Sequence, residues 1–596
     1  MIATMTRVSL ALLVSVVSLV LGNAVAHAAT YQVGPTRTWT QIGQAMATVG
    51  PGDVVQVDGS ATYSAVRWTK SGTAAQPIRL VGVLASGMRP LIRGGTNTVE
   101  IEADHVVMEG FDISGGSSRC FFHHGDDVTL RDSVVHDCPA HGILGADTDS
   151  GSALVEYVEV HHCGSGTQYH QIYMATDEVA HPGSVFRMQY CYVHDATGGN
   201  SVKSRAERNE IYFNWIEGAM YHELELIGPD PSGAPGGWSV DLKREDSDVV
   251  GNVLRKTSTS FVARIGGDAT GWSKGRYRFV NNTILTTTGS GAVFRLFDEL
   301  ESVEMHNNVI VTNGSGTPNV LRAAAGEFVW VNGTNLSGSN NWVMSGATNV
   351  PTQWTGTVTG TSPGLTNLTD DPRPVAGSPV LGAGNASAPG PAGFPFPSPL
   401  WPPGFHPPLR SLIPAGSATA RPSDGAIDIG AFELGSTTGT GGSGGAGGSS
   451  GGRGGAGAGG ASGRGGATAG VGGTSAGVGG RGGATAGVGG RGGATAGASG
   501  TTAGAGGAIA GAGGATAGAG GATAGASGGG ASGRGGARAG TGGALAGNAG
   551  TGGGDPPAPD GCSCDIAGGP SPLALFACVA LIAGALRRRS RAGRRR

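Results

Sequence analysis

The feature that most constrains the fold is a short segment that recurs at irregular intervals through residues 30–434. Each copy places an aliphatic residue inside a strand-like stretch, as in RDSVVHDC, VNNTILT and HNNVIVT. The spacing runs from 22 residues (Ile113 to Val135) to 38 residues (Ile216 to Leu254), which is one short supersecondary unit with loops of varying size. The shared aliphatic positions are Ile113, Val135, Val160, Val193, Ile216, Leu254, Ile284 and Ile310.

An asparagine accompanies four of these copies, always two residues before the aliphatic position. These residues are Asn214, Asn252, Asn282 and Asn308. A side-chain amide both donates and accepts hydrogen bonds. Asparagines stacked at equivalent turns are therefore expected to bond to one another along a ladder.

Strand-rich units of this length, with β-branched core positions and almost no helical periodicity, predict an all-β fold, a parallel β-helix. The alternative is an antiparallel sandwich, which should show hairpin turns at a regular spacing of about 8–12 residues. The stretch Thr38–Ser64 predicts a short amphipathic helix before the first strands. Such a helix would cap the open end of the solenoid.

The far end of this region carries two motifs, GSPVLGAG at 377–384 and GAIDIGAFEL at 425–434. Both resemble the closing segments of bacterial right-handed parallel β-helix proteins of the pectate-lyase-like superfamily. The resemblance covers residues 29–434, which we expect to form one β-helix domain. It specifies a fold more closely than an activity.

The N-terminal segment 1–28 has Arg7, an apolar run and then AVAHAAT, the pattern of a secretory signal peptide. A transmembrane anchor is the less favoured interpretation, because the run is short for a span. Residues 435–556 repeat units such as GGRGGATAGV and hold about half of the 115 glycines of the chain. We expect this part to be a disordered, flexible tether, since it cannot bury enough apolar surface to order itself.

The last segment, 557–596, contains Cys562 and Cys564, an apolar run and a block of arginines. These three parts, in this order, resemble the C-terminal sorting tail of myxobacterial surface proteins. The resemblance implies a protein that is exported and held at the cell envelope. It also implies a C-terminal hydrophobic helix in the membrane, before or instead of processing, with the arginines on the cytoplasmic side.

A second strand follows each repeat copy, as in NSVKSRA and HELELIG. Alternation places Val202 and Ser204 on one face of NSVKSRA and Lys203 with Arg205 on the other. Stacking the coils continues this outer face into a column of mixed charge in which cations dominate. Its expected members are His170, Tyr173, Lys203, Arg205, Glu223, Glu225, Lys243, Arg264 and Arg295.

Such a column suits an acidic polysaccharide, because arginine and lysine pair with carboxylates. Abstraction of the proton α to a uronate carboxylate needs a base and a group that neutralises the developing enolate. A lysine beside arginines can serve as that base when like charge lowers its pKa. The column therefore predicts a polysaccharide lyase that acts by β-elimination.

The relation of Lys243 to Arg264, 21 residues apart, resembles that of the lysine base and arginine in β-helical lyases of the chondroitinase B and alginate lyase type. The resemblance implies catalytic roles for Lys243 and Arg264, and a Ca²⁺ ion held by Glu223 and Glu225. The remaining members of the column would bind substrate. They are Lys203, Arg205, Arg295, Tyr173 and His170.

Two other interpretations stay open for this column. It can be a solvated outer face, or it can bind polysaccharide without cleaving it, as a surface adhesin would. A net charge of −3 gives no indication of nucleic acid binding. We expect a monomer.

Further residues suggest other chemistry. Asp126 and Asp127 offer the carboxylates of a hydrolase, although a turn before a strand is the simpler interpretation. His136, His161 and His194 recur after the aliphatic position and suggest either a metal site or turn hydrogen bonding. Cys138 and Cys163 share a repeat position, where stacked thiols or a disulfide both fit.

Overall fold

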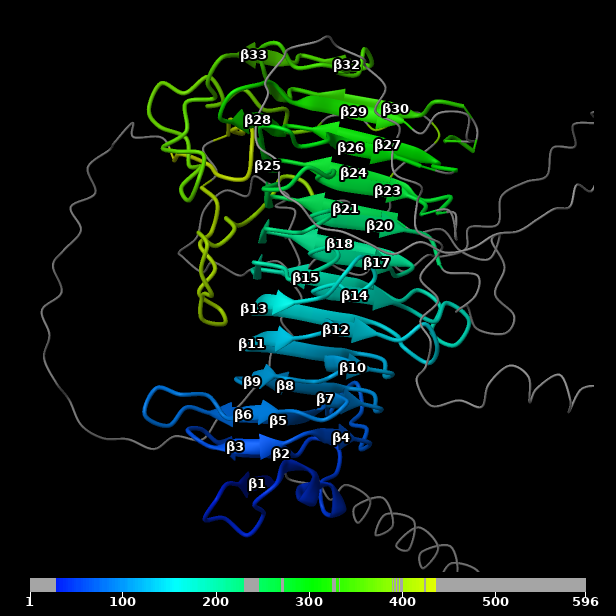
Figure 1. The fold of residues 1–596 in the computed structure, drawn as a ribbon, viewed down its shortest axis with the longest axis vertical. Coiled ribbons are helices and arrows are strands. Elements are labelled where there is room, and N and C mark those ends of the chain that lie inside the picture. Colours follow the sequence, from blue (N-terminus) through cyan, green and yellow to red (C-terminus); the bar gives the residue numbers. More distant parts are fainter. Residues whose placement is uncertain are drawn as a thin grey trace, which may run out of the picture. The chain divides into compact units, whose positions relative to one another are not determined.

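The chain folds into a parallel β-helix with three strands in each full coil, and strand stacks upon strand from coil to coil (Figure 1). The computed structural model describes residues 28–229, 246–268, 273–297, 299–323, 329–331, 333–387, 390, 393, 396, 400–422 and 425–435. The expected signal peptide, the Gly-rich tether, the C-terminal tail and Lys243 lie outside these residues. The all-β class and the β-helix predicted from the repeat are confirmed.

One face of the coil stack is a sheet of ten parallel strands, here called sheet B. Neighbouring strands of such a sheet lie about 4.8 Å apart. In chain order its strands are β4 (Val66–Trp68), β7 (Asn97–Ile101), β10 (Arg119–His123), β12 (His141–Gly145), β14 (Ile172–Ala175), β17 (Val202–Arg205), β20 (Leu224–Ile227), β23 (Ala263–Gly266), β26 (Ala292–Leu296) and β29 (Asn319–Ala323).

The other 23 strands form two further parallel series that share one hydrogen-bonded sheet. The first series is β1 (Thr30–Val33), β2 (Val54–Asp58), β5 (Ile78–Val83), β8 (Val106–Glu109), β11 (Val128–Cys138), β13 (Ala153–Cys163), β15 (Phe186–Gln189), β18 (Arg208–Tyr212), β21 (Asp246–Val250), β24 (Arg276–Val280), β27 (Ser302–His306), β30 (Leu336–Ser339) and β32 (Trp354–Thr355). The second series is β3 (Thr62–Ser64), β6 (Leu91–Arg93), β9 (Asp112–Ser114), β16 (Tyr192–His194), β19 (Trp215–Glu217), β22 (Val253–Arg255), β25 (Thr283–Thr287), β28 (Val309–Asn313), β31 (Trp342–Met344) and β33 (Val358–Gly360). The long strands β11 and β13 pair with members of both series.

The eight aliphatic positions of the repeat stack in register through the interior. Val135 pairs with Ile113 and Val160, and the column continues in register to Ile310. All eight side chains are fully buried. Burial of one aliphatic residue per coil contributes about 1.5–3 kcal/mol each, so this column is a main source of stability.

The asparagine ladder also forms as predicted and extends by one residue. The Nδ2 atom of each asparagine donates to the Oδ1 of the next at 3.0 Å, from Asn214 through Asn252, Asn282 and Asn308 to Asn341. The residue before each asparagine has a positive φ, between 51° at Asn340 and 69° at Gly251. Each coil therefore turns sharply at one place, and the amides satisfy the backbone groups that the turn would otherwise bury unpaired.

The N-terminal cap is a short 3₁₀ helix, η1 (Ile42–Ala47), which buries Ile42 and Ala45 against the first coil. At the far end, the chain after Val375 runs back along the outside of the second strand series (Figure 1). Val380, Ile429 and Phe432 pack there on outward-facing residues such as Trp215 and Trp342. No helix within the described residues is long and apolar enough to cross a membrane.

Candidate functional site

The predicted column of charged residues lies on the outer face of sheet B. Tyr173 pairs in register with Lys203, Lys203 with Glu225, Glu225 with Arg264, and Arg264 with Arg295. The alternation expected for NSVKSRA is also found, since Val202 belongs to the core and Lys203 faces out. One residue on each of β14, β17, β20, β23 and β26 thus lines this column.

These side chains form a connected ionic network. The Nζ atom of Lys203 lies 3.1 Å from Oδ2 of Asp268 and 3.5 Å from Oε2 of Glu225. Arg205 donates to the same Asp268 oxygen, and Arg264 donates to Oε1 of Glu225 at 3.3 Å. The ammonium of Lys203 also lies 5.7 Å from the ring centroid of Tyr173, within cation–π range.

Asp268 is the member of this network that sequence reasoning did not single out. It follows β23 at the end of FVARIGGD and joins the cations of β17, two coils away. The sequence signal was a lone carboxylate after a double glycine at the end of a strand. Its pairing with Lys203 and Arg205 depends on the conformation of the chain after β23, which the repeat does not specify.

The network is buried, so the interpretation of this face as a solvated exterior is wrong. Lys203 is 2% exposed, Arg205 1% and Glu225 4%. Charged groups persist at such burial only when they are paired, because desolvating an unpaired ion costs several kcal/mol. Burial works to raise the pKa of Glu225, but the charges of Lys203 and Arg264 outweigh it and hold that pKa below its usual value.

Glu223 does not join Glu225, although both were expected as ligands of one Ca²⁺ ion. Its carboxylate accepts from Ser201 Oγ at 3.0 Å and from the backbone N of Ala219 at 3.2 Å, and it lies 3.4 Å from Nζ of Lys256. Burial raises the pKa of Glu223. In the described part of the chain no three His, Cys, Asp or Glu side chains are arranged to hold a metal ion. The Ca²⁺ site stays a prediction.

Three neutral imidazoles flank the charged column. His170 was expected there, whereas His141 and His222 were not, although all three begin the quoted strands HGILGAD, HQIYMAT and HELELIG. Burial lowers the pKa of His141 and of His222 to about 3, and that of His170 well below its usual value. A shared position at the start of three stacked strands was the signal that could have found them.

The hydrogen bonds of His170 define its tautomer. Its Nδ1 accepts from the backbone N of Asn200 at 3.0 Å, so the proton of the neutral ring sits on Nε2. That Nε2 atom is buried and has no hydrogen-bond partner among the described residues. His170 is thus held inside the structure beside Tyr173, whose ring centroid is 6.0 Å from its own.

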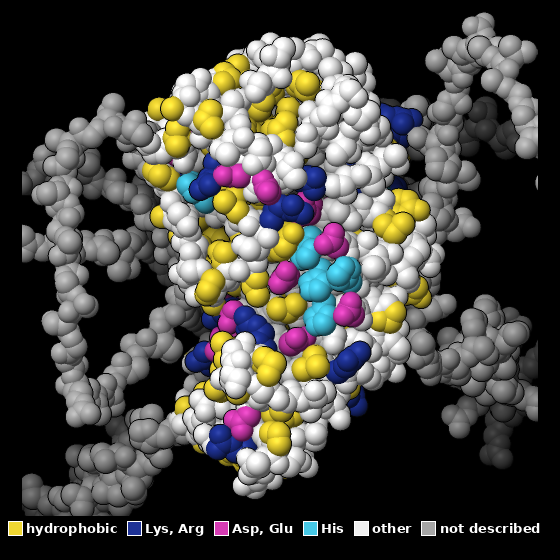
Figure 2. Space-filling model, turned by 60° about the vertical axis from the view of Figure 1, so that its left-hand side comes forward, with side chains coloured by type: hydrophobic (Ala, Val, Ile, Leu, Met, Phe, Trp, Pro, Cys, Tyr) yellow, Lys and Arg dark blue, Asp and Glu magenta, His cyan; other side chains and the backbone are white. Residues whose placement is uncertain are grey.

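A second histidine column lies on a different face, where Figure 2 shows imidazoles flanked by carboxylates. The rings of His136, His161 and His194 stack at 5.2 and 5.1 Å. His136 bonds to Asp112 at 2.8 Å, and His194 bonds to Glu159 at 3.1 Å. These bonds join side chains on neighbouring strands and not turns, so hydrogen bonding holds the histidines as the simpler interpretation expected, although between coils; none of the described His, Cys, Asp and Glu side chains are grouped to hold a metal ion.

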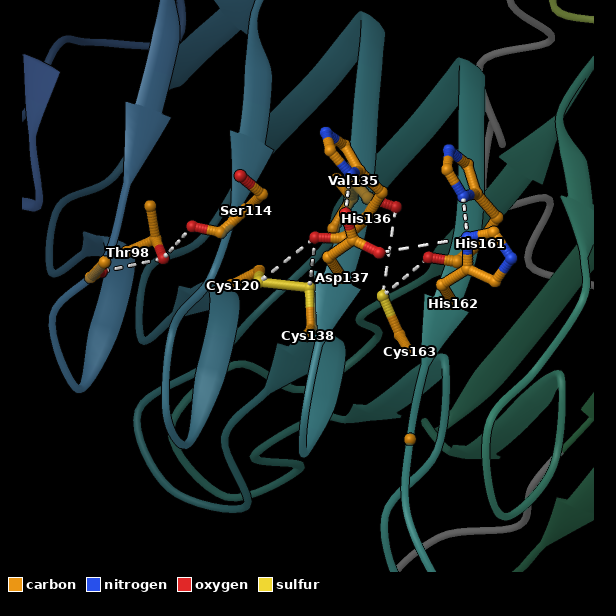
Figure 3. The surroundings of a disulfide bond; sticks show 12 residues. Thr98, Ser114, Cys120, Val135, His136, Asp137, Cys138, His161, His162 and Cys163 are labelled. Carbon is orange, nitrogen blue, oxygen red and sulfur yellow. Dashed lines mark hydrogen bonds and ion pairs between the residues drawn. A yellow bond between two sulfur atoms is a disulfide. The ribbon is translucent and has the colours of Figure 1, made fainter. Parts of the chain in front are cut away.

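The cysteines and the aspartate pair also have structural roles. Cys120 and Cys138 form a disulfide, and Cys163 is in register with Cys138 one coil further on (Figure 3). Cys163 is a buried free thiol, and burial raises its pKa to about 12, so it is a poor nucleophile.

Asp127 has φ +55° in the turn that precedes β11, and Asp126 accepts from the backbone N of Ser152.

No protein-family model matches the sequence, and no curated protein sequence matches it. Among solved structures, the chain is similar to an alginate lyase from Paenibacillus sp. str. FPU-7, with 14% identity and a TM-score of 0.35 over 56% of this chain and 99% of that one. Pectate lyase Pel9A gives 11% identity and a TM-score of 0.39 over 68% and 96%. The mannuronan C-5 epimerase AlgE6 A-module of Azotobacter vinelandii gives 14% and 0.29 over 53% and 93%. Likenesses of this size say nothing about the activity of this chain.

Proposed function

We propose that the chain binds acidic polysaccharide along the outer face of sheet B and cleaves uronate-containing chains by β-elimination. The observation that carries the proposal is the in-register column of Lys203, Glu225, Arg264 and Arg295 on adjacent strands. The cations on β17, β23 and β26 lie two strands and then one strand apart along one axis, and such a row suits a polymer whose carboxylates recur along its length.

In this reaction a base removes the proton on the carbon next to the uronate carboxylate. The electron pair forms a carbon–carbon double bond, the bond to the glycosidic oxygen breaks, and that oxygen takes up a proton. We assign Lys243 as the base and Arg264 as the group that neutralises the carboxylate in the enolate-like transition state. Lys203 is the alternative base, although its bonds to Asp268 and Glu225 favour a role in binding anions.

The remaining members of the column would position the sugar. Arg295 and Arg205 offer guanidinium groups to further carboxylates, and Tyr173 lies beside Lys203. The neutral ring of His170, whose centroid lies 6.0 Å from that of the Tyr173 ring, would help to position that side chain.

An assay for unsaturated uronate tests this proposal. The mature protein is incubated with alginate, polygalacturonate and other uronate polysaccharides, and the ultraviolet absorbance of the new double bond is followed. We expect product with at least one of them, and loss of product in Lys243→Ala and Arg264→Ala. Arg93→Ala, an exposed cation on β6, is the matched control and should keep full activity. Absence of product from every polysaccharide, with folded protein, would overturn the lyase.

The same assay decides the roles of Lys203 and of calcium. If Lys203 only binds substrate, Lys203→Ala should raise KM more than it lowers kcat, whereas loss of a base lowers kcat. Addition of a chelator tests the predicted dependence on Ca²⁺ through Glu223 and Glu225, with activity restored by Ca²⁺ if the ion is needed.

A polysaccharide-binding surface protein without catalysis is the second candidate. It is favoured by the saturation of Lys203 and Arg205 by Asp268, which resembles a structural ion network more than a reactive base. Retardation in polysaccharide-containing gels without any unsaturated product would support it.

We also propose that the protein acts as a monomer outside the cytoplasm, exported by segment 1–28 and held at the cell envelope by segment 557–596 across the 435–556 tether. Cell fractionation tests this. Deletion of residues 557–596 should move the protein from the envelope to the medium, and retention at the envelope after the deletion would contradict the proposed anchor.

A further inference from the structure

A strip of exposed apolar side chains runs beside the charged column of sheet B. Tyr169 is 44% exposed, Met220 52% and Tyr221 39%. Tyr169 and Tyr221 stand four residues before Tyr173 and Glu225, which belong to the column. Large apolar side chains exposed together near a site of mixed charge are typical of binding surfaces.

Gly199 occupies the coil between the two tyrosines. The backbone N of Tyr221 donates to Gly199 O at 2.9 Å, and a Cβ on Gly199 would lie 2.3 Å from Tyr169 O. Gly199 also has φ +58°, which side-chain-bearing residues rarely adopt. The position between the tyrosines is thus kept free of a side chain. Two coil steps separate the tyrosine backbones by about 9.6 Å, close to the length of two linked pyranose rings.

The loop that carries Met220 and Tyr221 is held rigidly. Lys256 donates to the backbone O of Ala219 at 3.1 Å and to that of Tyr221, and Ser258 donates to Met220 O at 3.2 Å. Lys256 pairs with Glu223 at 3.4 Å, and both side chains are fully buried. A buried ion pair is costly to desolvate, and here it fixes the backbone of an exposed apolar loop. Such preorganisation lowers the entropic cost of binding.

The surroundings match one kind of occupant. The flanking rings of His141 and His222 are neutral, and His141 packs edge-to-face on Tyr169 at 5.2 Å. The cations Lys203, Arg264 and Arg295 belong to the column of Tyr173 and Glu225, which comes four residues after the two tyrosines. A uronate sugar has C–H faces that stack on aromatic rings and a carboxylate edge that binds cations, so it can satisfy both strips at once.

We propose that Tyr169 and Tyr221 form a stacking platform for alternate pyranose rings of a uronate polysaccharide that lies along the coil stack. This deepens the proposed function and rests on it for the identity of the polymer. The platform would orient the polysaccharide parallel to the axis of the β-helix. The cation column would select a polysaccharide that carries negative charge.

Affinity electrophoresis in gels that contain alginate or polygalacturonate tests the platform. Tyr169→Ala and Tyr221→Ala should each weaken binding about two- to tenfold, as expected for loss of one aromatic contact, and the double variant should approach the product of the two. Tyr169→Phe and Tyr221→Phe keep the ring and should bind as the wild type does. Met88→Ala, at a 56% exposed methionine remote in sequence, is the control for loss of exposed apolar surface.

The outcomes separate the two proposals. If the double alanine variant binds as tightly as the wild type while Arg264→Ala weakens binding, the platform is wrong and the proposed glycan site stands. If the wild type is not retarded by any uronate polysaccharide, the proposed function fails and the platform fails with it. Tyrosine-dependent retardation without unsaturated product supports the platform on a protein that binds without cleaving.

Discussion

Lys203 and Glu225 occupy paired positions on β17 and β20, with Nζ of the lysine 3.5 Å from Oε2 of the glutamate and both side chains buried. Glu225 also accepts from Arg264, so one carboxylate links cations on the two strands beside it. The outer face of sheet B is therefore a packed ionic network. A ligand that binds there competes with these internal partners for the same cations.

Glu225→Ala should lower the free energy of unfolding by about 3–5 kcal/mol, because it leaves buried cations without their partner. Urea titration followed by circular dichroism measures this loss. Asp371→Ala is the control, since its partner Arg373 is 54% exposed, and it should cost less than about 1 kcal/mol. An unchanged urea midpoint for Glu225→Ala would show that the network does not stabilise the folded state.

A substitution in the middle of the asparagine ladder should destabilise the protein. Asn252→Ala removes the acceptor of the backbone N and Nδ2 of Asn214 and the donor to Ile211 O. Each buried polar group left unpaired costs about 1–3 kcal/mol, so the urea midpoint should fall clearly. Asn349→Gly, at φ +53° and bonded only to Asn319 among the described residues, should stay within about 0.5 kcal/mol of the wild type. Equal effects of the two variants would contradict the ladder's role.

Acid should destabilise the protein through its buried neutral histidines. Burial lowers the pKa of His222 from 6.5 to about 3, so between these values the unfolded chain binds a proton that the folded chain does not. The stability from this group is complete above pH 6.5 and is lost as the pH falls towards 3. The melting temperature of His222→Phe should therefore depend less on pH across this window than that of the wild type.

The contribution of His136 to stability changes with pH in the opposite direction, so this residue serves as the control. The hydrogen bond to Asp112 raises the pKa of His136 above its usual value, so its contribution is complete below pH 6.5 and is lost as the pH rises through the raised pKa. His136→Phe should therefore change the pH dependence of the melting temperature only above pH 6.5, by removing a gain of stability on acidification, whereas His222→Phe should flatten the acid loss below pH 6.5. Parallel pH profiles for the two variants would contradict this assignment.

Thiol labelling should separate the four cysteines of the β-helix. Cys163 and Cys191 are buried and burial raises both thiol pKa values to about 12, so iodoacetamide should leave them unmodified in the native protein and alkylate them after denaturation. Cys120 and Cys138 should be labelled only after reduction. Peptide mass spectrometry gives the result residue by residue. Labelling of Cys163 in the native state would show that its coil opens.

Loss of the disulfide should be costly but not fatal. It closes a loop across 18 residues, for which chain entropy predicts about 3 kcal/mol. Cys120→Ser together with Cys138→Ser should lower the urea midpoint accordingly and leave the coil stack folded, because the aliphatic column and the asparagine ladder do not depend on it. A double variant that fails to fold would show that the disulfide is needed to form the first coils.

The sequence by itself determined the coil. The aliphatic position recurs in all eight copies and the asparagine two residues before it in four of them, and a parallel stack brings equivalent residues together whatever the loops do. For this reason Ile113 to Ile310 form one buried column, Asn214 to Asn308 form one ladder, and Lys203 stands between Tyr173 and Glu225. Each of these contacts joins residues at the same place in the repeat.

Only the tertiary structure decided which charges meet away from equivalent positions. Asp268 pairs with Lys203 and Arg205 across two coils. Glu223 pairs with Lys256 and does not share a site with Glu225. Cys138 forms its disulfide with Cys120 and not with Cys163. These choices depend on the lengths and folding of the turns, which differ from coil to coil. The repeat therefore predicts the scaffold and one column of its outer face, and the turns decide how far that column is buried and what it pairs with.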